Sequence, residues 1–168
     1  MFSKACEYGI KAAIFIAANS HHDIRVSLSS ISIGIDSPKA YTAKVLQQLT
    51  KNHIIDSVKG PAGGFAIEKK RVQTLMLREI VSAIDGDAIF TECGLGFQNC
   101  NEDQPCPLHY KYKYIRNDLK QMLETTSLFD LLQNIDKGMS FLKRWHHERI
   151  FKQPTIKLPD KPLTIKIF

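Results

Sequence analysis

The stretch "VSLSSISIGIDSPKAYTAKVLQQLTKNHIIDSVKGPAGGF", residues 26–65, decides the fold. Ser27 is in position to cap a short helix, and Gly34 is in position to end it. Ser37 followed by Pro38 is typical of an N-cap with proline at the first helical position. The stretch therefore opens with a predicted helix, a turn and a second helix.

The second predicted helix has two different faces. Its apolar positions recur at helical spacing and form a stripe for the core, namely Tyr41, Val45, Leu46 and Leu49. The other faces carry mainly polar and basic residues and no acidic one, namely Lys39, Ala40, Thr42, Lys44, Gln47, Gln48 and Lys51. A helix of this kind can pack on a core with one face and meet a polyanion with the other.

The end of the stretch predicts a β-hairpin. Two short β-prone runs, residues 54–58 and 65–67, flank a turn that Lys59 enters. The turn itself consists of small and rigid residues, among them Gly60, Pro61, Gly63 and Gly64. A hairpin directly after a helix-turn-helix can act as a wing, because the second helix enters the major groove while Lys59 and exposed amides reach nearby phosphates.

Each of these elements also has a simpler interpretation. A helix-turn-helix is a common packing unit of helical proteins, and a glycine-rich hairpin could bind a nucleotide phosphate. The phosphate-loop pattern G-x-x-x-x-G-K-[ST] is missing, however. The charge adds weight to the DNA interpretation, because 23 Lys+Arg against 17 Asp+Glu gives a net charge of +6. A membrane surface or solubility alone could also use that charge.

Double-stranded DNA is therefore the predicted partner. The residues expected to contact it in the second helix are Ser37, Lys39, Tyr41, Thr42 and Lys44. The residues expected to contact it in the wing are Lys59, Gly60, Gly63 and Gly64.

The apolar run at residues 8–18 raises the question of a signal peptide. Glu7 precedes the run and Lys11 interrupts it, which is not the pattern of a secretory signal. The run is also too short to cross a bilayer. We expect a cytoplasmic protein with no membrane association, in which thiols stay reduced.

Three of the four cysteines lie in "CGLGFQNCNEDQPCPLH", residues 93–109, with the spacing C-x6-C-x5-C. Thiolates are soft ligands that select iron-sulfur clusters or zinc, and the glycines allow the loop to bring them together. Cys93, Cys100 and Cys106 are thus predicted metal ligands. Zinc is the less favoured metal, since the close C-x2-4-C pairs of structural zinc sites are missing.

Helices are predicted on both sides of the cysteine loop. Residues 3–19 and 74–86 have helical apolar patterns, as do residues 110–126, and residues 127–136 can form a short helix after a Ser127 cap. A length of 168 residues suits one core with a helical extension.

These features together resemble the IscR/NsrR/CymR-like (Rrf-two type) family of winged helix-turn-helix transcriptional regulators. The most specific match is "KNHIIDSVKGPAGGF", and the likeness covers residues 1–140. The resemblance implies a mainly α fold with a small β-hairpin, in which a winged helix-turn-helix DNA-binding domain is joined to a long dimerisation helix of a homodimer.

The corresponding domain prediction has three parts. The DNA-binding head spans residues 1–72, and the dimerisation helices span residues 73–145 with the cysteine loop at about 91–109. A C-terminal tail follows at residues 146–168.

The resemblance also offers two candidates for a fourth ligand. His109 matches the ligating histidine of IscR-like members, which would suit a [2Fe-2S] cluster. Glu7 matches the acidic ligand that NsrR-like members supply from the other subunit, which would suit a [4Fe-4S] cluster. The six-residue first gap differs from the five-residue gap of IscR-like members. Cys6 lies outside the motif and is expected to be a buried small hydrophobe.

The predicted function is that of a homodimeric DNA-binding transcription regulator that senses iron-sulfur, redox or nitric-oxide status through a cluster on three cysteines. The alternative is a cluster-free regulator that uses a thiol switch or a protein partner. An enzyme is not expected, because the histidine pairs at residues 21–22 and 146–147 have no recognisable catalytic partners.

Overall fold

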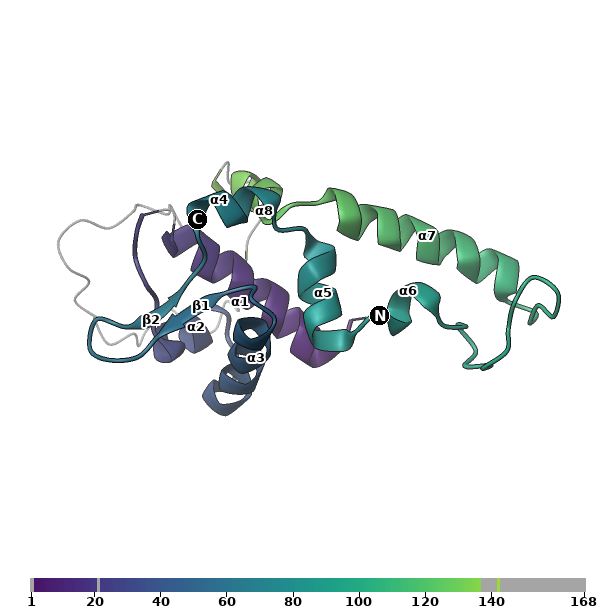
Figure 1. The fold of residues 1–168 in the computed structure, drawn as a ribbon, viewed down its shortest axis with the longest axis horizontal. Helices are drawn as coiled ribbons and strands as arrows, with labels where there is room; N and C mark the ends of the chain where they lie inside the picture. Colours follow the sequence, from purple (N-terminus) through teal and green to yellow (C-terminus); the bar gives the residue numbers. More distant parts are fainter. Residues whose placement is uncertain (1, 21, 137–141, 143–168) are drawn as a thin grey trace, which may run out of the picture.

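The computed structural model describes residues 2–20, 22–136 and 142, and the predicted tail at residues 146–168 lies outside this part of the chain. The chain forms a head from which a long arm projects (Figure 1). The elements of the head, in chain order, are α1 (Lys4–Ser20), α2 (Leu28–Gly34), α3 (Lys39–Lys51), β1 (Asp56–Val58), β2 (Gly64–Ala66) and α4 (Lys69–Thr74). The elements that follow are α5 (Leu77–Asp85), α6 (Ala88–Thr91), α7 (His109–Thr125) and α8 (Leu128–Asp136).

The core of the head is built around α1. This helix is apolar around most of its circumference, so most of its surface must be covered, and it packs against α3, α5 and α8. Ile16 of α1, Leu46 of α3 and Ile80 of α5 are completely buried. Leu128 and Leu132 of α8 join the same core, although α8 follows the arm in sequence.

The helix-turn-helix forms as the sequence predicts, with one shift. The hydroxyl of Ser27 caps α2 by accepting a hydrogen bond from the Ser30 amide at 3.1 Å. Helix α3 begins at Lys39 with Pro38 as its N-cap, so the expected Ser37 cap with proline at the first helical position is wrong by one residue. The hydroxyl of Ser37 instead forms a hydrogen bond with that of Thr42.

The wing consists of β1 and β2, which pair antiparallel with Ser57 opposite Phe65. Strand β1 is shorter than predicted, because Ile54 and Ile55 are buried in the core ahead of it rather than paired in the sheet, and β2 has the predicted length but begins one residue earlier. Val26 adds a third chain segment, since it exchanges two backbone hydrogen bonds of 2.9 Å with Phe65. The wing is therefore tied to the residue that precedes the helix-turn-helix.

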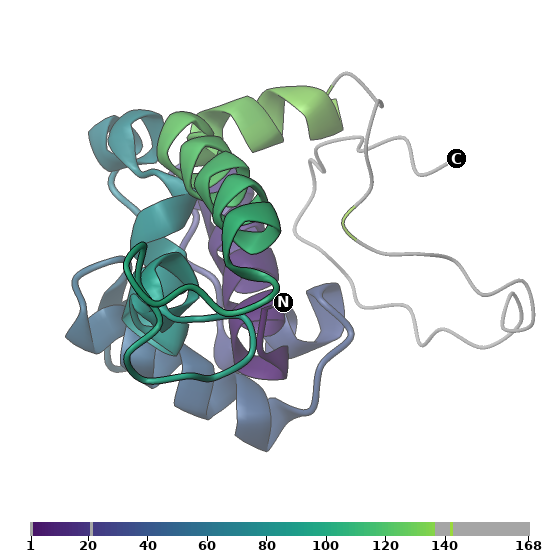
Figure 2. The same cartoon turned by 90° about the vertical axis from the view of Figure 1, so that its right-hand side faces the viewer.

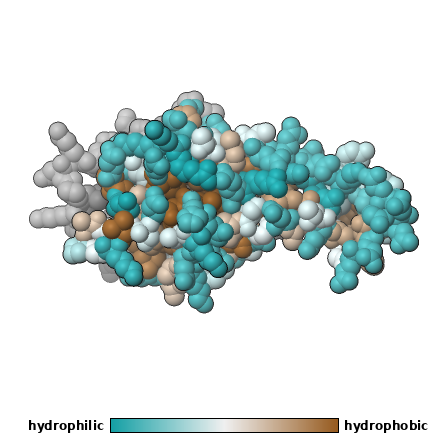
Figure 3. Space-filling model, in the orientation of Figure 1, coloured by the Kyte–Doolittle hydropathy of each residue, from teal (hydrophilic) through white to brown (hydrophobic). Residues whose placement is uncertain are grey.

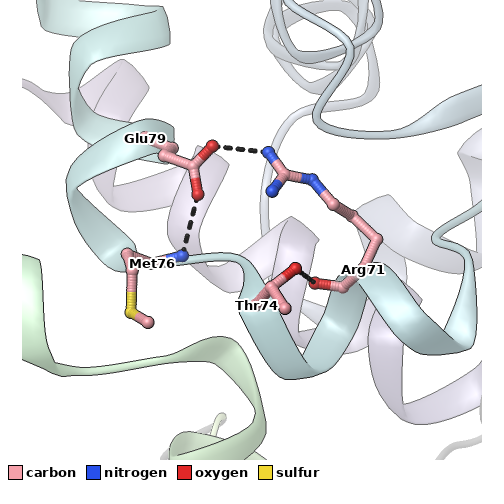
Figure 4. Close-up of polar contacts among 4 residues, drawn as sticks. All are labelled: Arg71, Thr74, Met76 and Glu79. Atoms are coloured by element: carbon pink, nitrogen blue, oxygen red, sulfur yellow. Dashed lines mark hydrogen bonds and ion pairs between the residues drawn. The ribbon is translucent and has the colours of Figure 1, made fainter.

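The helix predicted at residues 74–86 begins three residues later, at Leu77, and a short helix that was not predicted, α4, precedes it. Helix α4 ends at Thr74 and α5 begins at Leu77, with Met76 between them in an extended conformation. Glu79 accepts a hydrogen bond from the Met76 amide at 3.1 Å and pairs with Arg71 of α4 at 2.5 Å (Figure 4). The carboxylate of Glu79 thus fixes the angle between the two helices.

The arm is attached to the head where two connections run side by side. The Leu77 amide donates to the Thr126 carbonyl at 3.0 Å, and the Leu128 amide donates to the Leu75 carbonyl at 2.8 Å. Helix α7 runs outward from this junction, with α6 beside it and the cysteine loop at its far end (Figures 1 and 2). Within the described part of the chain, no helix has the length and apolar character to cross a membrane.

Candidate metal centre and DNA-binding surface

The outward side of α3 carries the predicted basic residues. Lys39, Tyr41 and Lys44 are exposed, while Val45, Leu46 and Leu49 face the core. Tyr41 is thus on the outer side rather than in the core stripe to which its spacing also assigned it. The structure therefore leaves the polar and basic face of α3 exposed to solvent.

Thr42 is not on this surface. Its side chain is 0% exposed, and its hydroxyl donates to the Pro38 carbonyl at 3.0 Å while it also bonds to Ser37. The prediction that Thr42 contacts DNA directly is therefore wrong. A threonine can be buried in a helix when its hydroxyl bonds to the carbonyl four residues earlier, and here this bond holds the first turn of α3.

The residues at the tip of the wing have two different roles: some are exposed to solvent, and others allow the sharp bend of the chain. Lys59 and Gly60 are exposed, and Gly60 has φ of 106° with open space around it. A Cβ on Gly63 would lie 2.2 Å from the Val58 carbonyl oxygen, and Gly64 combines φ of 134° with close approach to Val26. Gly63 and Gly64 are therefore required by the bend of the hairpin.

Helix α1 contributes two lysines near this surface that were not predicted to contact DNA. The Tyr8 ring packs edge-on against Tyr41 of α3, with 5.6 Å between centroids. The ammonium groups of Lys4 and Lys11 each lie 5.8 Å from the Tyr8 ring centroid. Their signal in the sequence was the spacing of residues 4, 8 and 11, which places all three on one helix face.

The three loop cysteines meet at the end of the arm. The sulfur atoms of Cys93, Cys100 and Cys106 all lie within 4.8 Å of one another, and those of Cys93 and Cys106 are 3.6 Å apart. All three residues are half-buried. Residues up to thirteen positions apart in sequence thus present three soft donors to one point.

His109 adds a nitrogen to this group. It is the first residue of α7, and its Nδ1 lies 3.1 Å from the Cys100 sulfur. Its Nε2 is buried and has no hydrogen-bond partner among the described residues. Glu7 is not brought to the centre within one chain, because its carboxylate pairs with Lys4 on α1 at 2.7 Å.

The environment of the thiols differs between the centre and the head. Hydrogen bonds from the Leu95 and Phe97 backbone amides lower the pKa of the Cys93 thiol to about 7. Burial raises the pKa of Cys106 above its ordinary value. Cys6 is completely buried in the head, and burial raises its pKa to about 12, so it is an inert core thiol.

Comparison with known proteins identifies the family. Residues 2–134 match the Rrf2 family, described as "Iron-dependent Transcriptional regulator". The chain belongs to the Rrf2 family. A protein of Aquifex aeolicus that carries the name of an HTH-type transcriptional regulator is 31% identical over 142 residues, which are 83% of this chain and 96% of that protein. The regulator IscR of Cronobacter sakazakii is 28% identical over 141 residues, which are 84% of this chain and 85% of IscR.

Solved structures give the same fold. CymR, the global cysteine regulator of B. subtilis, is 20% identical with a TM-score of 0.67, over 81% of this chain and 98% of CymR. IscR of T. potens is 18% identical with a TM-score of 0.63, over 84% of this chain and 92% of IscR. The resemblance and the mainly helical winged fold are confirmed, and the relatives are transcriptional regulators rather than enzymes.

The burial of Thr42 predicts that its substitution affects stability rather than DNA sequence preference. Thr42→Val keeps the shape and removes the hydroxyl, so the free energy of unfolding in urea should fall by about 1 kcal/mol. Thr42→Ser keeps the hydroxyl and serves as the control, with a smaller loss expected. A changed base preference at unchanged stability would contradict this assignment.

Proposed function

We propose that this Rrf2-family protein is a homodimeric transcription regulator whose DNA affinity depends on an iron-sulfur cluster bound at the end of its arm. The observation that carries the proposal is the convergence of the Cys93, Cys100 and Cys106 sulfurs with His109 beside them. The family description names an iron-dependent regulator, and relatives named IscR support the same class.

The donor set suits such a cluster. Three thiols supply soft ligands, and His109 has a buried ring nitrogen still free of a partner within the described residues. We propose His109 rather than Glu7 as the fourth ligand, because His109 already contacts Cys100 whereas Glu7 pairs with Lys4. By the resemblance, this ligand set favours a [2Fe-2S] cluster over a [4Fe-4S] cluster. When bound, the cluster would supply a centre that changes with oxidation or iron supply.

We propose that α3 enters the major groove and the wing tip follows the backbone. Lys39, Tyr41 and Lys44 are available for contacts on α3, with half-buried Ser37 just before the helix. In the wing, Lys59 and Gly60 would face phosphates, whereas Gly63 and Gly64 would act by shaping the tip. Lys4 and Lys11 would add phosphate contacts from α1, because they flank the Tyr8 ring that packs on Tyr41.

The arm supports the proposed homodimer. Most of α7 lies outside the core, and Figure 3 shows hydrophilic side chains over much of the arm. Four large apolar or aromatic side chains of α7 are nonetheless exposed, namely Tyr110 at 55%, Tyr114 at 71%, Ile115 at 63% and Met122 at 46%. Packing of α7 against its twin would cover such residues. We accordingly assign residues 1–72 to the DNA-binding head and residues 73–145 to dimerisation, in a cytoplasmic protein.

The route from the arm to DNA would run through the junction of the arm with the head. Backbone hydrogen bonds join Leu77 to Thr126 and Leu128 to Leu75, and an ion pair joins Arg78 of α5 to Glu124 of α7. A change in how two α7 helices pack would thereby move two heads relative to each other. Spacing between recognition helices governs binding to two half-sites, so this movement would change DNA affinity.

The cluster is tested by anaerobic purification. The native protein should be coloured and contain iron and acid-labile sulfide, whereas Cys100→Ser should lose both because one of three thiolates is missing. Cys6→Ala removes the core thiol outside the centre and should keep its iron. Visible absorption would distinguish the two cluster types.

A colourless native protein without iron would contradict the cluster. The cluster-free alternative, in which the thiols or a protein partner control DNA binding, would then take its place. The distance of 3.6 Å between the Cys93 and Cys106 sulfurs is compatible with such a thiol pair.

The wing is tested by the salt dependence of DNA binding. Lys59→Ala should weaken binding to all sequences and reduce the slope of log affinity against log salt by about one unit, because one phosphate contact is lost. Titration by fluorescence anisotropy at several salt concentrations measures this slope. Lys120→Ala removes the same charge from the arm and should leave the slope unchanged. An unchanged slope in Lys59→Ala would count against the wing contact.

A further inference from the structure

Arg116 of α7 contacts the chain immediately before the first cysteine of the centre. Its Nη1 donates hydrogen bonds to the carbonyl oxygens of Thr91 at 3.2 Å and Glu92 at 2.8 Å. These carbonyls lie at the end of α6, and Glu92 directly precedes Cys93. The guanidinium therefore fixes the backbone from which the Cys93 side chain extends.

Arg116 belongs to a helix face that contacts the cysteine loop at further points. The ring of Tyr112 lies against Gly94 so closely that a Cβ there would approach ring atoms at 2.9 to 3.0 Å. Lys113 forms an ion pair with Glu102 in the middle of the loop. With His109 at Cys100, the contacts come from helix positions 109, 112, 113 and 116, whose spacing of three, four and seven defines one face.

A long loop needs such contacts to hold a fixed geometry. Residues 92–108 contain no helix or strand, and ordering them costs conformational entropy. Arg116 is suited to oppose this cost, because a guanidinium presents fixed donors and its charge strengthens hydrogen bonds to carbonyls. Its Nε is buried without a hydrogen-bond partner in the described part of the chain, so Arg116 anchors the loop through the Nη1 contacts.

We infer that Arg116 is a positioning residue for the three-cysteine centre, holding Cys93 in place through the carbonyls of Thr91 and Glu92. The inference deepens the proposed function, since it concerns the same site. It nevertheless refers to the arrangement of the thiols themselves, and it can be measured without iron. When a residue that orients a metal ligand is replaced, the affinity for the metal falls, although the residue is not itself a ligand.

The test is an anaerobic titration of reduced, metal-free protein with Co²⁺ alone, followed by the thiolate-to-cobalt absorption. Arg116→Met should bind Co²⁺ about tenfold more weakly than the native chain. The absorption per bound cobalt should also fall, because Cys93 is lost as a ligand. Lys120→Met is the matched control, as it removes one positive charge one turn further along α7, and it should bind Co²⁺ like the native chain.

Native Co²⁺ affinity and absorption in a folded Arg116→Met variant would overturn the inference, as would an equal loss in Lys120→Met or a native chain that binds no Co²⁺. Circular dichroism checks folding. If Arg116→Met loses helix content, the Arg116→Lys variant is measured in its place, because lysine keeps the charge but lacks the planar donors. Its Co²⁺ affinity should be partly reduced, and a native Co²⁺ affinity in this variant would overturn the inference. Iron and sulfide in the native protein test the proposed function separately, so iron-free protein with a cobalt defect in Arg116→Met would refute only that function.

Discussion

The need to cover the apolar faces of α1 determines the arrangement of this protein. Gly9, Ala12, Ala13 and Ala17 are buried along the helix, and small side chains allow neighbouring elements to come close. One side is covered by α3 and another by α5, while α8 returns from beyond the arm to complete the core. Because both ends of the arm are thereby tied to the head, α7 projects as a tethered element rather than as a free extension.

The same constraint separates the two sites that the proposed function connects. The outward face of α3 and the wing lie on the head, and the three-cysteine centre lies at the far end of α7 (Figure 1). Any coupling between them must therefore pass along the arm. Helix α7 is continuous from His109, beside the cysteine loop, to Thr125, beside the junction at which the Leu77 amide bonds to the Thr126 carbonyl. A rigid element of this kind can transmit a change at one end to the other.

Much of the fold follows from local patterns, which the sequence carries in full. The helix predicted at residues 3–19 is Lys4–Ser20, that at 110–126 is His109–Thr125, and Gly86 ends α5 as expected with φ of 76°. The three loop cysteines could be predicted as metal ligands from the sequence, because ligand chemistry depends on residue type and spacing.

What the sequence could not reveal depends on distant partners. The break between α4 and α5 arises because Met76 pairs with Ser127, and the amphipathic pattern runs through it unchanged. Thr42 has the polar side chain of a surface residue, but it is buried, and its hydroxyl is satisfied by a hydrogen bond to the Pro38 carbonyl. Arg116 has no signal at all, since its partners are backbone carbonyls that any residues at positions 91 and 92 would provide.

The proposed coupling between cluster and DNA is tested by measuring the DNA affinity of one anaerobic preparation before and after a chelator removes its cluster. Each form would first be used to select fragments from a random duplex library, and both forms would then be titrated on the selected fragments. If the cluster controls DNA binding, the two affinities should differ by about tenfold or more on at least one fragment, as is typical when two sites are coupled. Equal affinities of the two forms on every selected fragment would contradict the proposed coupling.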